Sequence, residues 1–279
     1  MVIHSGTPEP ALFTAEDKLH QRLAPHLQRV LIVEPQPAAV KLLADLLRSI
    51  AATQIVSAAT DQKALQMAAV VDPQIIFMEH SGPSLDGARL ARAIRRSDFS
   101  CRKAPIIMVT GEATAQAILG ARDAGVHEFL RKPFTIKDLL RRLEAVALKP
   151  RDWVEAVQYV GPDRRRFNSG DYAGPRKRKS DARKTPDEAR LIQALKIVRA
   201  AAGALDSDWP QARRALLAQA ADIQKVAVSV SNPTMMEAAA ALSRQLTDET
   251  ATDRRALDGA IGSLLVFMPP EAAEAARAA

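Results

Sequence analysis

The pattern of apolar and polar positions in the first half of the chain alternates between two periods. Short apolar runs bounded by turn residues are typical of strands buried on both faces of a sheet. Between these runs, apolar residues recur at helical spacing, as at Val40, Leu43 and Leu47. Strands that alternate with helices predict an α/β fold with a doubly wound parallel sheet. The runs that predict its five strands are Val30–Val33, Gln54–Ala58, Gln74–Met78, Pro105–Val109 and His127–Arg131.

The last third of the chain has a different pattern. Residues 185–279 are rich in Ala, carry apolar residues at helical spacing and have almost no strand pattern. Short connections between helices favour an antiparallel bundle, so this segment predicts an all-α helical bundle. Its four predicted helices begin at the capping box Thr185–Glu188, at Asp208, at Asn232 and at about Thr252.

Four polar side chains follow the predicted strands directly. Parallel strands place their carboxyl ends at one edge of the sheet, where binding sites of doubly wound folds lie. We therefore expect these side chains to converge. They are Glu34, Glu79, Thr110 and Lys132.

Several of these segments resemble the receiver domain of response regulators. IIFMEHSGPSLDG, from Ile75 to Gly87, is similar to the third strand and following loop of that family. The family's phospho-accepting aspartate stands eight residues before this glycine, and Glu79 occupies that position here. RVLIVEPQP is similar to the first strand and its acidic turn. The resemblance covers about residues 28–148 and implies a flavodoxin-like sheet with strand order 2-1-3-4-5.

The resemblance also assigns residues further along the chain. PIIMVT ends in Thr110, which matches the family's switch Thr or Ser. FLRKPF supplies Phe129 and Lys132, which match the switch aromatic residue and the active-site lysine. The implied function is non-catalytic signalling of the two-component or phosphorelay type. The implied partners are signalling proteins that dock on the face made by the family's fourth helix, fifth strand and fifth helix.

Two of the three acidic positions depart from the family pattern. The acidic pair after the first strand is replaced by Glu34 and Pro35, and proline offers no side-chain oxygen. Glu79 is one methylene longer than aspartate, so its carboxylate is displaced. Mg²⁺ demands near-octahedral oxygen ligands, and phosphoryl transfer depends on positioning. We therefore expect neither Mg²⁺ binding nor phosphorylation, and no other metal site.

Three interpretations of Glu79 remain open at this point. It mimics the phosphorylated state by pairing with Lys132, it is a degenerate acceptor without signalling meaning, or it retains residual phosphorylation. The helical bundle is interpreted as an interaction or homodimerisation module. All five histidines precede residue 128, so the bundle has no phosphoryl carrier of the histidine phosphotransfer kind. A helix-turn-helix in its second and third helices is an alternative.

The positive charge of the chain is concentrated between these two regions. The formal net charge is +7, and Gly161–Lys184 alone holds nine Lys or Arg against three Asp. Arginine binds phosphate bidentately, and an aromatic ring beside it can stack on a base. An imperfect repeat with Tyr159 and Tyr172 predicts an anion-binding site. Its candidate residues are Tyr159, Arg164, Arg165, Arg166, Tyr172, Arg176, Lys177, Arg178 and Lys179.

Four interpretations of this basic stretch stay open. It is a solvated linker, it binds an anionic nucleotide second messenger, it binds nucleic acid or an anionic membrane surface, or it binds an acidic protein. Cyclic di-GMP is the candidate second messenger, because the density of arginines loosely resembles that of a subgroup of receivers that binds this nucleotide. The stretch lacks a strict RxxxR motif. Gly-Pro pairs and a high charge predict an extended, irregular chain when it is free.

These patterns predict four regions. Residues 1–27 are expected to be a mostly flexible extension, residues 28–148 an atypical receiver, residues 149–184 an arginine-rich linker and residues 185–279 a helical interaction domain. The single cysteine, Cys101, excludes internal disulfides and fits a reducing compartment. No run of 18 apolar residues and no signal-peptide pattern is present, so we expect a cytoplasmic protein without a transmembrane segment.

Overall fold

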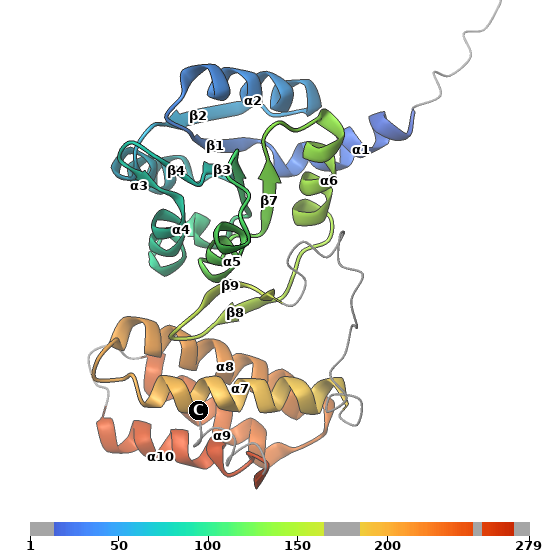
Figure 1. The fold of residues 1–279 in the computed structure, drawn as a ribbon. Helices are drawn as coiled ribbons and strands as arrows, with labels where there is room; N and C mark the ends of the chain where they lie inside the picture. Colours follow the sequence, from blue (N-terminus) through green and yellow to red (C-terminus); the bar gives the residue numbers. More distant parts are fainter. Residues whose placement is uncertain (1–13, 165–184, 248–252, 271–279) are drawn as a thin grey trace, which may run out of the picture. The chain divides into compact units, whose positions relative to one another are not determined.

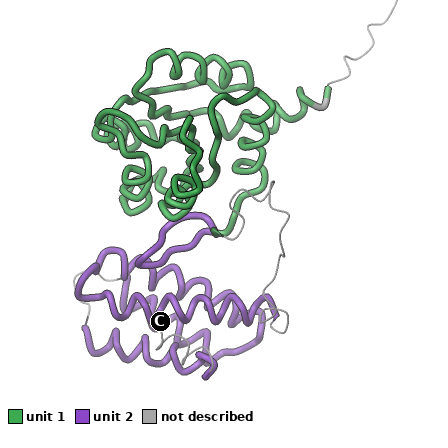
Figure 2. The backbone as a smooth tube through the Cα atoms, in the orientation of Figure 1, with its two compact units in different colours: residues 1–152, 164–167 green, residues 153–163, 168–279 purple. Residues whose placement is uncertain are grey.

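The computed structural model describes residues 14–164, 185–247 and 253–270. These residues divide into two compact units (Figure 2). Residues 14–152 and Arg164 belong to an α/β unit. Residues 153–163 and the described residues from 185 onwards belong to a second, helical unit. Each unit has its own apolar core, so each is described by itself.

The α/β unit is built on a five-stranded parallel sheet (Figure 1). Its strand order is β2-β1-β3-β6-β7, which is the predicted order 2-1-3-4-5. The apolar runs located every strand to within one residue at either end. The strands are β1 (Arg29–Val33), β2 (Gln54–Ala58), β3 (Ile75–Glu79), β6 (Ile106–Thr110) and β7 (Glu128–Arg131).

Helices cover both faces of this sheet, which explains why its central strands, β1, β3 and β6, are apolar without alternation. In β1, Ile32 belongs to the core under one pair of helices, and its neighbour Leu31 belongs to the core under the other three. Both residues are at most 1% exposed. The first pair is α2 (Pro37–Ile50) and α6 (Ile136–Ala147), and the three are α3 (Asp61–Val71), α4 (Gly87–Arg96) and α5 (Ala115–Asp123).

The expectation of a flexible extension over residues 1–27 is corrected for its second half. Helix α1 (Ala15–Leu23) begins at a capping box, and the short helix η1 (Ala24–His26) follows it. Leu23 and Leu27 are 0% exposed and belong to the core under α2 and α6. Pro25 does not end this segment because it lies in the first turn of η1, where a missing N–H costs no hydrogen bond. Residues 1–13 lie outside the described chain.

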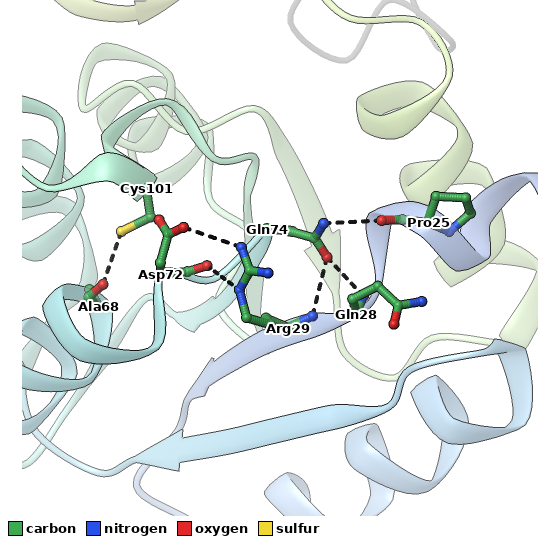
Figure 3. A network of polar contacts seen from close by, with 7 residues as sticks. All are labelled: Pro25, Gln28, Arg29, Ala68, Asp72, Gln74 and Cys101. Atoms are coloured by element: carbon green, nitrogen blue, oxygen red, sulfur yellow. Dashed lines mark hydrogen bonds and ion pairs between the residues drawn. The ribbon is translucent and has the colours of Figure 1, made fainter.

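Gln74 ties this N-terminal segment to the amino-terminal edge of the sheet (Figure 3). Its side-chain nitrogen donates to the carbonyl oxygen of Pro25 at 3.1 Å. Its side-chain oxygen accepts from the backbone N–H of Gln28 at 2.9 Å and from that of Arg29 at 3.2 Å. The segment is therefore held by hydrogen bonds between its backbone and the side chain of Gln74, as well as by apolar packing.

Cys101 lies in the same region (Figure 3) and is buried. The thiol is 3% exposed and donates to the carbonyl oxygen of Ala68 at 3.3 Å. Burial raises the pKa of Cys101 to about 11. Since the thiolate is the reactive form, this cysteine is an inert core residue.

The helical unit contains the four predicted helices. Helix α7 packs against α8 and α10, and α9 packs against the same two helices, so the four close into a bundle. Small residues such as Ala215 and Ala239 are fully buried in its core and let the helices approach closely. The helices are α7 (Pro186–Ala202), α8 (Trp209–Ser229), α9 (Pro233–Thr247) and α10 (Arg254–Leu265).

The predicted irregular linker is corrected over residues 153–163. These residues form an antiparallel hairpin of β8 (Trp153–Glu155) and β9 (Val160–Pro162) that belongs to the helical unit. Val154 packs against the bundle core, and Gln211 of α8 donates to the buried carboxylate of Glu155 at 2.9 Å. The hairpin obtains its apolar burial from α8, about 50 residues away in the sequence, and a local pattern cannot show such a contact.

A buried polar cluster lies at the start of β7, away from the strand ends that hold the candidate site. Arg95 is 0% exposed, and its guanidinium donates to the carbonyl oxygens of Gly125, Arg102 and Ala104 at 2.7–2.9 Å. It also donates to Nδ1 of His127 at 3.1 Å. The backbone N–H of Ile106 donates to the same Nδ1 at 3.3 Å, so the ring proton of neutral His127 lies on Nε2.

This arrangement makes the α/β unit sensitive to acid. Burial first, and then the charges of Arg95 and Arg151, hold the pKa of His127 well below its usual 6.5. A folded-state pKa below the unfolded value means that the unfolded chain binds more protons as the pH falls below 6.5. We expect the free energy of unfolding to fall by up to about 1.4 kcal/mol per pH unit below that point. Urea unfolding of the chain between pH 7 and about pH 5 measures this slope.

Two asparagine variants distinguish the contribution of His127 to this pH dependence from that of the other titrating groups. His127→Asn keeps a side-chain acceptor near the position of Nδ1 but cannot be protonated, so it is expected to flatten the slope. His26→Asn changes an exposed histidine of the same unit and is expected to leave the slope as it is. An unchanged slope in His127→Asn contradicts the assignment.

Candidate functional site

The carboxyl ends of the sheet strands bring together the residues that the sequence singled out. Glu34 follows β1 directly, Glu79 is the last residue of β3 and Thr110 is the last residue of β6. Lys132 follows β7, and its backbone N–H donates to the carbonyl oxygen of Thr110 at 2.8 Å. The parallel registers of β1 with β3 and of β3 with β6 place these ends at one edge.

Lys132 lies between the two glutamates. Its Nζ is 2.7 Å from Oε2 of Glu34 and 2.7 Å from Oε2 of Glu79. The second oxygens of both carboxylates accept backbone N–H groups, from Gln36 at 2.9 Å and from His80 at 2.6 Å. The side chains of Glu34 and Glu79 are 8% and 12% exposed. We call Glu34, Lys132 and Glu79 the ion-pair cluster.

The charge state of the cluster follows from this geometry. Partial burial acts to lower the pKa of Lys132, but the hydrogen bonds and charges of Glu34 and Glu79 outweigh it and raise this pKa above its usual 10.5. Lys132 is therefore fully protonated at neutral pH. With both carboxylates ionised, the cluster carries a formal charge of −1.

The loops around the cluster are packed closely on one another. A Cβ atom at position 82 would lie 2.8 Å from Cγ of Pro35, so Pro35 touches the loop that follows β3. A Cβ atom at position 87 would lie 2.3 Å from the carbonyl oxygen of Glu79, which explains the need for Gly87. Its backbone N–H donates to His80 at 2.8 Å and closes this loop. Pro35 thus takes up space beside the acidic edge without supplying an oxygen.

The two residues that match the family's switch positions are both buried. Thr110 is 2% exposed, and its hydroxyl oxygen accepts the backbone N–H of Glu112 at 3.2 Å. Phe129 is 4% exposed and belongs to the core under α3, α4 and α5, together with Leu90 and Met108. Neither side chain is presented to solvent.

The proposed anion-binding residues of the basic stretch are only partly described. Tyr159 is 8% exposed, and its hydroxyl donates to the carbonyl oxygen of Pro162 within the hairpin, so the expected stacking role of this ring is corrected. Arg164 lies 3.0 Å from the carboxylate of Asp123 on α5. The remaining candidates fall outside the described residues, and their role stays a prediction. They are Arg165, Arg166, Tyr172, Arg176, Lys177, Arg178 and Lys179.

The family to which the α/β unit belongs follows from two comparisons. Residues 30–144 match the model of the response regulator receiver domain. The chemotaxis protein CheY of Pseudomonas aeruginosa is 30% identical over 118 residues, which are 42% of this chain and 94% of that protein. The chain belongs to the response regulator receiver family. The receiver domain of this chain is therefore the α/β unit that carries the ion-pair cluster.

Other relatives share the receiver domain within longer proteins. The transcriptional regulatory protein PdtaR of Mycobacterium tuberculosis is 32% identical over 45% of this chain and 59% of its own length. A protein-glutamate methylesterase/protein-glutamine glutaminase of a Nocardioides species is 35% identical over 44% of this chain and 34% of its own. The chain thus spans less than two thirds of these relatives. The solved structure of CheY4 from Vibrio cholerae is 23% identical over 43% of this chain and 98% of that one, with a TM-score of 0.40.

Some features of the site had no signal in the sequence. The carboxylate contacts from the backbone of Gln36 and His80 depend on loop conformation, which residue types alone do not reveal. The position of Lys132 equally close to both glutamates depends on the strand registers.

Within the residues that the structure describes, no helix is long and apolar enough to cross a membrane.

Proposed function

We propose that this receiver domain signals by docking to protein partners in a single state that phosphorylation does not switch. The observation that carries the proposal is the position of the Lys132 ammonium, 2.7 Å from both Glu34 and Glu79. In this arrangement an ammonium supplied by the chain itself lies between the two carboxylates and compensates one of their two charges. The site therefore needs neither a metal ion nor a phosphoryl group to be complete.

The oxygen donors at the site do not fit Mg²⁺. This ion needs near-octahedral oxygen ligands and binds through carboxylates and water. Pro35 supplies no oxygen, and the facing oxygens of Glu34 and Glu79 already accept hydrogen bonds from Lys132. A divalent cation between these oxygens would have to displace the Lys132 ammonium, which already occupies this position. We propose that the domain works without Mg²⁺ or another cofactor.

Glu79 is poorly placed to accept a phosphoryl group. Both of its carboxylate oxygens are engaged, one with Lys132 and one with the N–H of His80. Phosphoryl transfer requires an attacking oxygen that is free to align with the leaving group, and these two hydrogen bonds restrain both oxygens of Glu79. Its ion pair with Lys132 and the buried hydroxyl of Thr110 support the interpretation that Glu79 mimics the phosphorylated state over the other two.

The surface through which this state would act is the face of α5, β7 and α6. These elements correspond to the fourth helix, fifth strand and fifth helix of the family. Leu119 on α5 is 48% exposed, and Arg131 at the end of β7 is exposed as well. An exposed apolar residue and an exposed cation on these elements are suited to a signalling protein with an apolar and acidic surface. The helical unit is proposed as a second interaction module.

The proposal predicts that acetyl phosphate with Mg²⁺ leaves the chain unmodified. Intact-protein mass spectrometry is expected to show no phosphorylated species, and hydrogen exchange of α5, β7 and α6 is expected to be unchanged. The matched variant is Pro35→Asp with Glu79→Asp, which restores the family's acidic residues. It is expected to gain a Mg²⁺-dependent acyl phosphate and changed exchange on the same face. A phosphorylated native chain that loses the modification on Glu79→Ala overturns the proposal.

A further inference from the structure

A cavity of about 210 Å³ lies in the receiver domain between α2 and the carboxyl ends of β1 and β3. Its walls are apolar and include Ile32, Leu43, Phe77 and Phe134. Well-packed protein interiors hold few voids larger than a water molecule. An apolar cavity of roughly 150 Å³ is already large enough to admit benzene. This cavity is therefore large enough for a small aromatic or branched alkyl group.

All three residues of the ion-pair cluster are among the residues that line the cavity. Lys132 uses two of its three N–H donors on Glu34 and Glu79. Each carboxylate accepts this bond and one from a backbone N–H, from Gln36 or from His80. An ionised carboxylate has about four acceptor positions, so acceptors remain while most donors are used. Together with its formal charge of −1, this makes the ion-pair cluster complementary to a cation that donates hydrogen bonds.

The cavity is accessible from solvent on the side of α2. Leu42, which also lines it, is 61% exposed, and the neighbouring Ala39 is half-buried. A ligand can therefore enter without unfolding the core. The apolar walls and the ion-pair cluster together are complementary to an amphipathic molecule whose charge lies at one end.

We propose that this cavity binds a small amine with an aromatic or branched alkyl body. The body fills the space between Leu43, Phe77 and Phe134, and the ammonium donates hydrogen bonds to Glu79 and Glu34. The proposal goes beyond the docking role, because it rests on the cavity and on the charge balance of the cluster. It holds whether or not a partner protein docks on the face of α5, β7 and α6.

Binding of three probes to the full chain tests this assignment. The probes are 2-phenylethylamine, ethylbenzene and 3-phenylpropionate, which share an aromatic body and differ in charge. Methyl NMR titration of leucine and valine is expected to show saturable shifts at Leu42, Leu43 and Val109 with the amine. The amine is expected to bind about tenfold more tightly than ethylbenzene, since bonds to a charged acceptor are stronger than apolar contact alone. The carboxylate probe is expected to cause no saturable shift.

Two phenylalanine variants on the same helix provide the matched control. Ala39→Phe places a ring in the cavity and is expected to abolish the shifts, whereas Ala38→Phe places the same ring on the exposed side of α2 and is expected to preserve them. Glu79→Gln is expected to remove the advantage of the amine over ethylbenzene. Equal binding of amine and ethylbenzene, tighter binding of the carboxylate, or no saturable shift with any probe each overturns the proposal.

Discussion

Replacing Lys132 with methionine is expected to lower the free energy of unfolding of the receiver domain by about 2–3 kcal/mol. The substitution removes the cation between Glu34 and Glu79 and leaves two carboxylates, 8% and 12% exposed, without a partner of opposite charge. Breaking a buried pair from one side typically costs about 3–5 kcal/mol, and the 30% exposure of Lys132 reduces this cost. Urea unfolding at neutral pH measures the difference.

The control for Lys132 is Lys149→Met. Lys149 pairs with Glu144 at 2.8 Å, but its side chain is 72% exposed, so its removal is expected to cost less than about 0.5 kcal/mol. Adding Glu79→Gln to Lys132→Met removes one unpaired carboxylate and is expected to recover about 1 kcal/mol. Because the pKa of Lys132 is raised, its contribution is present below the usual value of 10.5 and is lost as the pH rises through the folded-state value. A cost for Lys132→Met no larger than that of Lys149→Met contradicts the compensating role of this ammonium.

Replacing Arg95 with methionine is expected to cost about 3–5 kcal/mol, the largest effect among these substitutions. Its guanidinium is fully buried and satisfies three carbonyl oxygens and the Nδ1 atom of His127. Methionine fills much of the volume but removes the guanidinium donors from the three carbonyl oxygens and leaves Nδ1 of His127 with the N–H of Ile106 alone. Buried acceptors without a partner carry the full desolvation penalty, so their costs accumulate. Urea unfolding followed by circular dichroism measures the loss.

Arg92→Met is the matched control, because Arg92 lies on the same helix and is exposed. It is expected to change the free energy of unfolding by less than about 0.5 kcal/mol. If Arg95→Met does not fold, Arg95→Lys still tests the assignment, since lysine keeps the charge but lacks the planar fork. Arg95→Lys is expected to be less stable than the native chain by at least about 1 kcal/mol. Native stability in both Arg95 variants contradicts the role of this guanidinium.

The strands of the receiver domain could be predicted because burial on both faces requires a run of consecutive apolar residues, which is visible in the local sequence. The central strands are apolar at successive positions, as Val30 to Val33 are, since helices cover the sheet on both sides. The connecting helices needed only the 3.6-residue spacing of their buried side. The convergence of Glu34, Glu79, Thr110 and Lys132 followed from topology, because every parallel strand ends at the same edge.

The internal geometry of the site could be predicted only in part. The absence of a second acidic residue at Pro35 and the longer side chain of Glu79 are properties of residue type, visible in the chain itself. That Lys132 lies 2.7 Å from both glutamates depends on strand register and on loops closed by Gly87. The cavity beside the cluster depends on how α2 packs over β1 and β3, which no short segment encodes.

The resemblance to receiver domains implied the strand order and the acidic positions that depart from the family, whereas residue types and their periods by themselves predicted the strands of the parallel sheet and the four helices of the bundle. These features repeat locally and need no partner elsewhere in the chain. Only the tertiary structure decided that residues 15–27 belong to the receiver core and that residues 153–163 form a hairpin on the bundle. Short amphipathic segments bury too little surface alone to order themselves, so their structure depends on apolar surfaces supplied by distant residues. Tyr159 shows the consequence, because a ring that looks like an exposed stacking platform in the sequence is buried once such a surface is present.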